Sequence, residues 1–150
     1  MVGENANPDI DLYGETPVQT PGWGASLMAD KGNLLLMLYD KAIRCMEEAI
    51  VLIVAGDMIG KGAKIIQAQD IVLKLAESLD KNSGIEGATE IAFNLERLYL
   101  YVYTRLIRGN NQLDQKAIEE ALHLMGNLYR AWEQIILGSS VTSEPVSANA

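Results

Sequence analysis

Apolar residues recur at intervals of three and four through the middle of the chain, a spacing that predicts amphipathic helices. Short polar or glycine-containing segments divide the pattern into four helices, expected over residues 33–55, 59–79, 86–108 and 114–137. No run alternates apolar and polar residues as a half-buried strand does. Because short connections join long helices, we expect an all-α fold, an antiparallel up-down four-helix bundle over residues 30–137.

Capping and turn residues set the predicted helix ends. Asn33 can cap the first helix, and Ser83 and Glu86 have the spacing of a capping box for the third. Asp114 can cap the fourth helix. The expected breaks between helices are residues 56–57, 81–84 and 109–111.

One apolar stripe on each predicted helix forms the expected core. Its members are Leu35, Leu38, Ala42, Met46, Ala49, Ile53, Ile65, Ala68, Val72, Leu75, Leu79, Leu95, Leu98, Tyr99, Val102, Leu106, Ile118, Ala121, Leu122, Met125, Leu128, Tyr129, Trp132 and Ile136. The segment 34–42, L-L-L-M-L-Y-D-K-A, has more large side chains than one helix face needs. We expect Leu34, Leu36, Met37 and Tyr39 to spread around the helix, where they either flank the core or meet the N-terminal segment.

A second apolar set lies about 125° around the third predicted helix from its core stripe, and the second helix has similar displaced residues. A contiguous apolar surface of this kind marks a partner site, and a groove between two helices suits an amphipathic helix or an extended peptide. The alternative is that these residues pack beneath the N-terminal segment and bind nothing. The predicted groove residues are Ile66, Ile71, Leu73, Phe93, Leu100, Tyr101, Tyr103 and Ile107.

The terminal segments lack helical periodicity. Residues 1–29 hold three of the four prolines together with scattered apolar side chains, which predicts an N-terminal arm lying on or near the bundle. In this arm Leu12, Tyr13 and Val18 would cover the groove; a disordered leader is the alternative. The tail over residues 138–150 is expected to be disordered.

Composition excludes several classes of protein. A net charge of −8 and a pI near 4.6 disfavour binding to nucleic acid, and no apolar run approaches the ~20 residues needed for membrane insertion. The first eight residues have no basic residue and no apolar run, so we do not expect a signal peptide there. The single cysteine, Cys45, is expected to be a buried reduced thiol. These features together predict a cytoplasmic protein.

Three apparent chemical motifs do not make sites. Glu120 and His123 form an E-x-x-H pair, but a di-iron bundle needs two such pairs and the chain has one histidine. The glycine-containing segment 56–62 is one residue short of a phosphate loop, lacks the Ser or Thr after its lysine, and follows no strand. No nucleophile and base are credibly paired. We therefore expect no catalytic site, no metal and no cofactor, and hence no enzyme.

The chain resembles the FliS-type flagellar secretion chaperones, the chaperones of flagellin. The blocks that carry the resemblance are Leu34–Asp40 with Ala42, Gly56–Asp57, Lys64–Ile71, Leu79–Asp80, Asn94–Leu95, Leu98–Tyr99, Tyr101 and Arg130–Trp132, together with Tyr13, Thr16, Val18 and Thr20 near the start. Two departures stand out. The stretch 21–33 is longer than usual in the family, and Lys41 stands where the family often has glycine.

The resemblance implies a non-enzymatic cytoplasmic chaperone with an antiparallel helical bundle. Such proteins bind the disordered C-terminal segment of flagellin, prevent premature polymerisation and assist delivery to the flagellar type III export apparatus. Components of the export gate are further implied partners, and the family's N-terminal segment can cover part of the binding surface. The alternative function is a helical adaptor or regulator that binds a folded flagellar or secretion component.

Overall fold

The computed structural model describes the backbone of residues 23–140 and the side chains of residues 30–138. The described residues form helices α2 (Trp23–Ala55), α3 (Met58–Glu77), α4 (Ala88–Gln112) and α5 (Gln115–Ser140), with no strand among them. The predicted all-α four-helix architecture is confirmed. Within the same residues, no helix combines the length and the apolarity that crossing a membrane requires.

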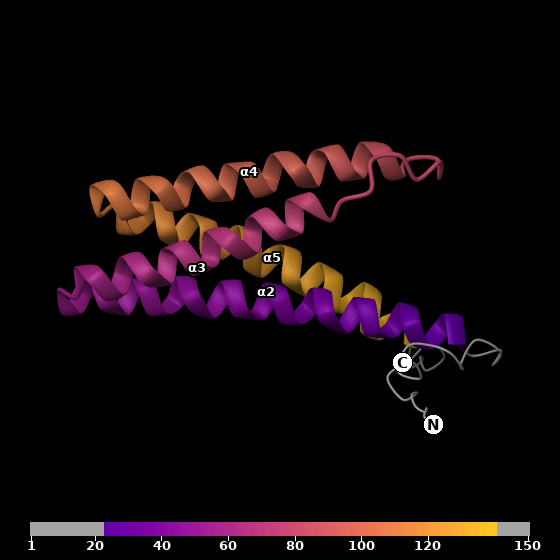
Figure 1. Ribbon diagram of the computed structural model, residues 1–150, viewed down its shortest axis with the longest axis horizontal. Coiled ribbons are helices and arrows are strands. Elements are labelled where there is room, and N and C mark those ends of the chain that lie inside the picture. The colour runs from indigo at the N-terminus through magenta and orange to yellow at the C-terminus, as the bar shows by residue number, and fades with distance from the viewer. Residues whose placement is uncertain (1–22, 141–150) are drawn as a thin grey trace, which may run out of the picture. The chain divides into compact units, whose positions relative to one another are not determined.

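The chain divides into two units, residues 1–34 and 35–150, and the bundle lies in the second. Its helices run alternately up and down, so the α2–α3 and α4–α5 turns lie at one end and the α3–α4 loop lies at the other (Figure 1). Helix α4 packs against both α3 and α5. An ion pair between Lys64 and Glu48, 2.9 Å apart, joins α3 to α2.

Apolar side chains from all four helices fill the core of the second unit, which contains most of the predicted stripes; Leu98 and Ile136 are not part of it, and Tyr39 and Ile71 are added to it. Tyr39, expected at the edge, is completely buried. Its hydroxyl lies 2.5 Å from that of Tyr99 and accepts a hydrogen bond from the indole N–H of Trp132 at 3.2 Å. A buried phenol is stable only when its hydroxyl has partners, and α4 and α5 supply them.

Two predicted helix starts are wrong. Helix α2 begins at Trp23, ten residues before Asn33, because no proline lies between Pro21 and Asn33 and the intervening residues can continue a helix. Helix α4 begins at Ala88 after Gly87, whose φ of 82° makes it a left-handed cap without a side-chain hydrogen bond. The Ser83 hydroxyl accepts from the N–H of Ile85 at 3.2 Å, so it stabilises the loop rather than the helix.

The α4–α5 turn also differs from its prediction. Gly109 does not end α4 but lies buried inside it, where a Cβ would overlap Ile118 of α5. Helix α4 ends at Gln112, and Leu113 takes the left-handed conformation. Asp114 caps α5 as expected, accepting from the N–H of Ala117 at 3.2 Å. The hydrogen bond from the Arg108 guanidinium and, to a lesser extent, that from the Ala117 N–H hold the pKa of the Asp114 carboxyl below its ordinary value.

The α2–α3 connection is a two-residue turn at the predicted break. Gly56 has a φ of 82°, and Asp57 caps α3 by accepting from the N–H of Gly60 at 2.9 Å. The glycine-containing segment is therefore the start of a helix after a helix, without the strand that a phosphate loop follows. Helix α3 stops at Glu77, two residues before the predicted end.

Residues 1–22 and 141–150 lie outside the described structure. The predicted arm residues Leu12, Tyr13 and Val18 are among them, so their role as a cover remains a prediction. Residues 23–29, assigned to the arm, belong to α2, and residues 138–140, assigned to the tail, belong to α5.

Candidate functional site

A strip of apolar side chains runs along the outside of α3 and α4. Six of the eight predicted groove residues form it, and we call it the α3–α4 strip: Ile66, Leu73, Phe93, Leu100, Tyr103 and Ile107. Leu73 and Tyr103 are half-buried, whereas the other four are exposed, Ile66 with 52% of its surface. A helix that only supports a bundle has polar residues at such positions, so the strip is a candidate binding surface.

The α3–α4 strip contains a groove of about 390 Å³ near the α3–α4 loop. Leu73 from α3 and Leu100 from α4 line it together, with Ala76 and Leu79 adding apolar surface. Its polar lining comes from Glu77, Lys81 and Glu96. The two displaced stripes of the sequence thus meet at one concave site, whose lining combines apolar and charged side chains.

Contacts at the opposite end fix the register of the two helices. The buried Lys61 at the start of α3 donates from its ammonium group to the carbonyl of Asn110 at 3.0 Å and to its side-chain oxygen at 2.7 Å. Because the helices are antiparallel and rise 1.5 Å per residue, Ile66 lies level with the segment 103–107 of α4. The strip therefore extends from the loop-end groove towards the α2–α3 turn.

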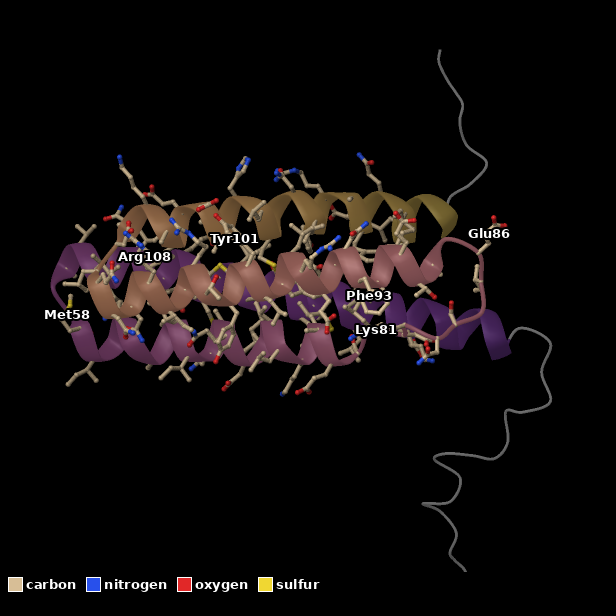
Figure 2. All side chains as sticks on the ribbon, turned by 90° about the horizontal axis from the view of Figure 1, so that it is seen from above. Met58, Lys81, Glu86, Phe93, Tyr101 and Arg108 are labelled. Atoms are coloured by element: carbon tan, nitrogen blue, oxygen red, sulfur yellow. The ribbon has the colours of Figure 1, made fainter. Side chains whose placement is uncertain are left out.

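Lys81 covers the loop end of the strip. Its ammonium group lies 2.7 Å from a carboxylate oxygen of Glu96 and 5.3 Å from the centre of the Phe93 ring, and Figure 2 shows Lys81 beside Phe93. The Lys81 carbonyl accepts from the Thr89 hydroxyl at 3.2 Å, which ties the loop to α4. Sequence analysis did not identify Lys81 or Glu96, because nothing in the helical period places a loop lysine over an aromatic ring.

Two predicted groove residues lie elsewhere. Ile71 is in the core with only 6% of its surface exposed, because it lies at i+3 from Ala68 and i−4 from Leu75, both buried. Tyr101 lies on the α5 side of α4 (Figure 2). Its hydroxyl donates to Glu120 of α5 at 2.6 Å, and this bond is the main cause of its raised pKa.

A second concave site lies between α2 and α3 and encloses about 530 Å³. Cys45 is in its lining, and its thiol donates to the side-chain oxygen of Gln67 at 3.4 Å. Burial raises the pKa of Cys45, so the thiol stays protonated and is a poor nucleophile, as its predicted core role requires. Among the described residues, no three His, Cys, Asp or Glu side chains gather as metal ligands, and His123 is exposed.

Comparison with known proteins gives the family of the chain. The family model described as "Flagellar protein FliS" matches residues 24–139. The flagellar secretion chaperone FliS of Salmonella typhimurium (strain LT2) is 34% identical over 127 residues, which cover 84% of this chain and 88% of the relative.

The proteins of the same name from Escherichia coli (strain K12) and Bacillus subtilis (strain 168) are also similar. The Escherichia coli protein is 32% identical, over 81% of this chain and 88% of its own length. The Bacillus subtilis protein is 30% identical, over 72% of this chain and 77% of its own length. The matched region contains the bundle of the second unit except the last residue of α5. The chain belongs to the FliS family of flagellar secretion chaperones.

Proposed function

We propose that this protein is a cytoplasmic, non-enzymatic chaperone that binds the disordered C-terminal segment of flagellin along the α3–α4 strip. Binding there would keep flagellin from polymerising prematurely and assist its delivery to the flagellar type III export apparatus. Components of the export gate would be further partners. The observation that supports this proposal is the strip of exposed and half-buried apolar side chains along α3 and α4, on a chain of this family.

The driving force would be burial of the strip against apolar residues of the client, at roughly 25 cal/mol per Å² of apolar surface. Ordering a disordered segment opposes binding, so a surface of several large side chains is needed rather than one pocket. Phe93, Leu100 and Ile107 repeat every seven residues on α4, which matches the apolar repeat of an amphipathic helix lying alongside. Leu12, Tyr13 and Val18 of the arm would compete for the same surface.

Copurification tests the client segment. The protein is expected to retain full-length flagellin and to lose flagellin that lacks its C-terminal segment. Equal recovery of both would refute the proposal. It would favour the alternative in which the protein is an adaptor for a folded flagellar or secretion component.

Substitution tests the strip. Leu100→Asp puts a carboxylate in the groove at an exposed position, so affinity for a flagellin C-terminal peptide should fall at least about tenfold while the fold is kept. Ile91→Asp in the first turn of α4 is the matched control, because Ile91 is also exposed, does not line the groove, and gives the same change in charge. Isothermal titration calorimetry would measure affinity and circular dichroism the fold. Equal affinity of the two variants would contradict the placement.

A further inference from the structure

The charged residues that border the α3–α4 strip differ in sign between its two helices. On a helix the surface neighbours of a residue lie three and four positions away from it. Around Ile66 and Leu73 of α3, the charged residues at these positions are Asp70 and Glu77, both exposed. We call them the α3 edge of the strip, and this edge is acidic.

The opposite border, on α4, is basic. Arg97 is exposed and lies four residues after Phe93 and three before Leu100, so it neighbours both. Its guanidinium donates to the side-chain oxygen of Asn94 at 2.6 Å, a neutral partner that leaves the positive charge uncompensated. Thr104, between Leu100 and the turn end, continues this border without charge. We call Arg97 and Thr104 the α4 edge.

Other charges near the strip do not change this polarity. Glu96 and Lys81 form an ion pair at 2.7 Å and add no net charge. Glu90 lies in the first turn of α4 and does not line the groove. Lys74 is turned about 100° around α3 from the strip residue that precedes it, so it lies outside the acidic edge.

Glu77 and Arg97 lie at the same level on the two sides of the groove. Leu73 and Leu100 line the groove together; Glu77 is four residues after the first and Arg97 is three before the second. Because the helices are antiparallel, the levels of Glu77 and Arg97 differ by only about one residue rise of 1.5 Å. Among the described residues, neither side chain is in an ion pair. Both charges are therefore available to a molecule that lies between them.

Such a pair of edges recognises one kind of helix. An amphipathic helix that rests its apolar face on the strip places one polar flank against α3 and the other against α4. Charge complementarity favours a basic flank on α3 and an acidic flank on α4. Reversing the direction of the helix, with its apolar face kept on the strip, exchanges the two flanks and puts like charges together.

We propose that the two edges select a client helix with one basic and one acidic flank, and that they fix the direction in which it lies along the strip. The inference rests on the proposed function, in which this helix belongs to the C-terminal segment of flagellin. Exposed charge pairs each contribute little to affinity. The apolar strip therefore holds the helix, and the edges orient it.

Charge reversal in the full chain tests the edges. In calorimetric titrations with a flagellin C-terminal peptide at low salt, Glu77→Lys and Arg97→Glu should each weaken affinity about three- to tenfold. The matched controls are Glu47→Lys on α2 and Lys116→Glu on α5, which are exposed, lie away from the strip and change the charge equally. Their affinities should equal that of the wild type. At about 1 M salt, where the screening length is about 3 Å, the losses should shrink.

Two designed peptides test the direction on the wild-type protein. Both form a helix with the same leucine face, one flank of lysines and one of glutamates, and they differ only in which flank carries which charge. They should bind with similar affinity in opposite directions. A nitroxide at the peptide N-terminus should broaden the amide signal of Lys81 with one peptide and that of Met58 with the other. These two residues lie at opposite ends of α3, about 30 Å apart.

The outcomes separate this inference from the proposed function. A flagellin peptide that does not bind the wild type would refute both. Normal binding of that peptide, with equal effects of the edge variants and the controls, would overturn this inference alone. The same direction for both designed peptides, or a mixture of directions with each, would also overturn it alone.

Discussion

The buried hydrogen bonds of Tyr39 make a sharp prediction about stability. Its hydroxyl bonds to Tyr99 of α4 and accepts from Trp132 of α5, so one side chain of α2 is joined to both α4 and α5. Tyr39→Phe keeps the ring and removes only the oxygen. The hydroxyl of Tyr99, which is 1% exposed, then loses its partner, and the half-buried indole N–H loses its acceptor.

The magnitude follows from the number of stranded groups. A buried polar group without a partner costs about 1–3 kcal/mol, and the indole N–H, being half-buried, can recover part of its cost from water. We expect Tyr39→Phe to lower the free energy of unfolding by about 2–3 kcal/mol. Tyr99→Phe leaves Tyr39 still accepting from Trp132, so its cost should be smaller, about 1–2 kcal/mol.

A double-mutant cycle separates the hydrogen bond from the packing. In the double Phe variant neither hydroxyl remains to be stranded, so its cost should be less than the sum of the single costs by about 1 kcal/mol. Urea unfolding followed by circular dichroism gives the four free energies, provided that the dependence on urea concentration is the same in all four proteins. Emission from Trp132 in a Trp23→Phe background, where it is the remaining indole, reports whether its N–H has lost the acceptor.

Additivity within about 0.3 kcal/mol would refute this reasoning, because it would mean that the two hydroxyls do not depend on each other. A cost of Tyr39→Phe below about 0.5 kcal/mol would refute it as well, since a surface substitution has effects of that size.

Three further predictions concern pH, packing and the two apolar surfaces of α3. Burial raises the pKa of the Tyr39 and Tyr99 hydroxyls above the ordinary value of 10.0, so these groups lose their protons at lower pH in the unfolded chain than in the folded one. The free energy of unfolding should therefore fall as the pH rises above 10. Urea unfolding between about pH 10 and 11.5 should show a smaller fall for Tyr99→Phe than for the wild type, because one of the two hydroxyls is missing. Gly109→Ala should lower the free energy of unfolding by about 1–3 kcal/mol, because the added Cβ overlaps Ile118 of α5. The Cβ added by Gly62→Ala meets its nearest neighbour at an ordinary contact distance, so thermal unfolding should show a neutral or stabilising effect. Ile71→Ala should lower the free energy of unfolding by about 2–4 kcal/mol and Ile66→Ala by less than about 1 kcal/mol, because Ile71 is buried and Ile66 is exposed. Of the two variants, only Ile66→Ala should weaken binding of a flagellin peptide. Equal losses of stability would contradict the assignment of Ile71 to the core.

Hydrophobic periodicity predicted the four helices and most of the core because burial repeats along a helix. It predicted less well the residues whose position depends on a neighbouring helix. Tyr39 could be placed in the core only by knowing that Tyr99 and Trp132 supply partners for its hydroxyl. Gly109 resembles a helix terminator in sequence, yet it stays helical because Ile118 occupies the space of its missing Cβ.

The predicted binding surface shows the same limit at finer detail. A helical wheel places residues about 100° apart, so Ile71 and Ile66 both fall off the core stripe of α3, one on each flank. Which flank is buried depends on where the next helix packs, and the structure buries Ile71. Lys81 was not predicted because loop residues have no period.

The distribution of polar groups explains how one small bundle can keep an apolar outer surface and still hold a unique fold. Its interior includes directional contacts that an apolar surface cannot imitate, the Tyr39–Tyr99–Trp132 bonds near the middle and the Lys61–Asn110 bonds near the turn end. These hydrogen bonds form only when α2, α3, α4 and α5 are in their observed register. An alternative packing of the helices that buried the α3–α4 strip would leave these buried polar groups without partners. The strip can therefore stay exposed for a partner, because the gain from burying it internally is opposed by the loss of these buried hydrogen bonds.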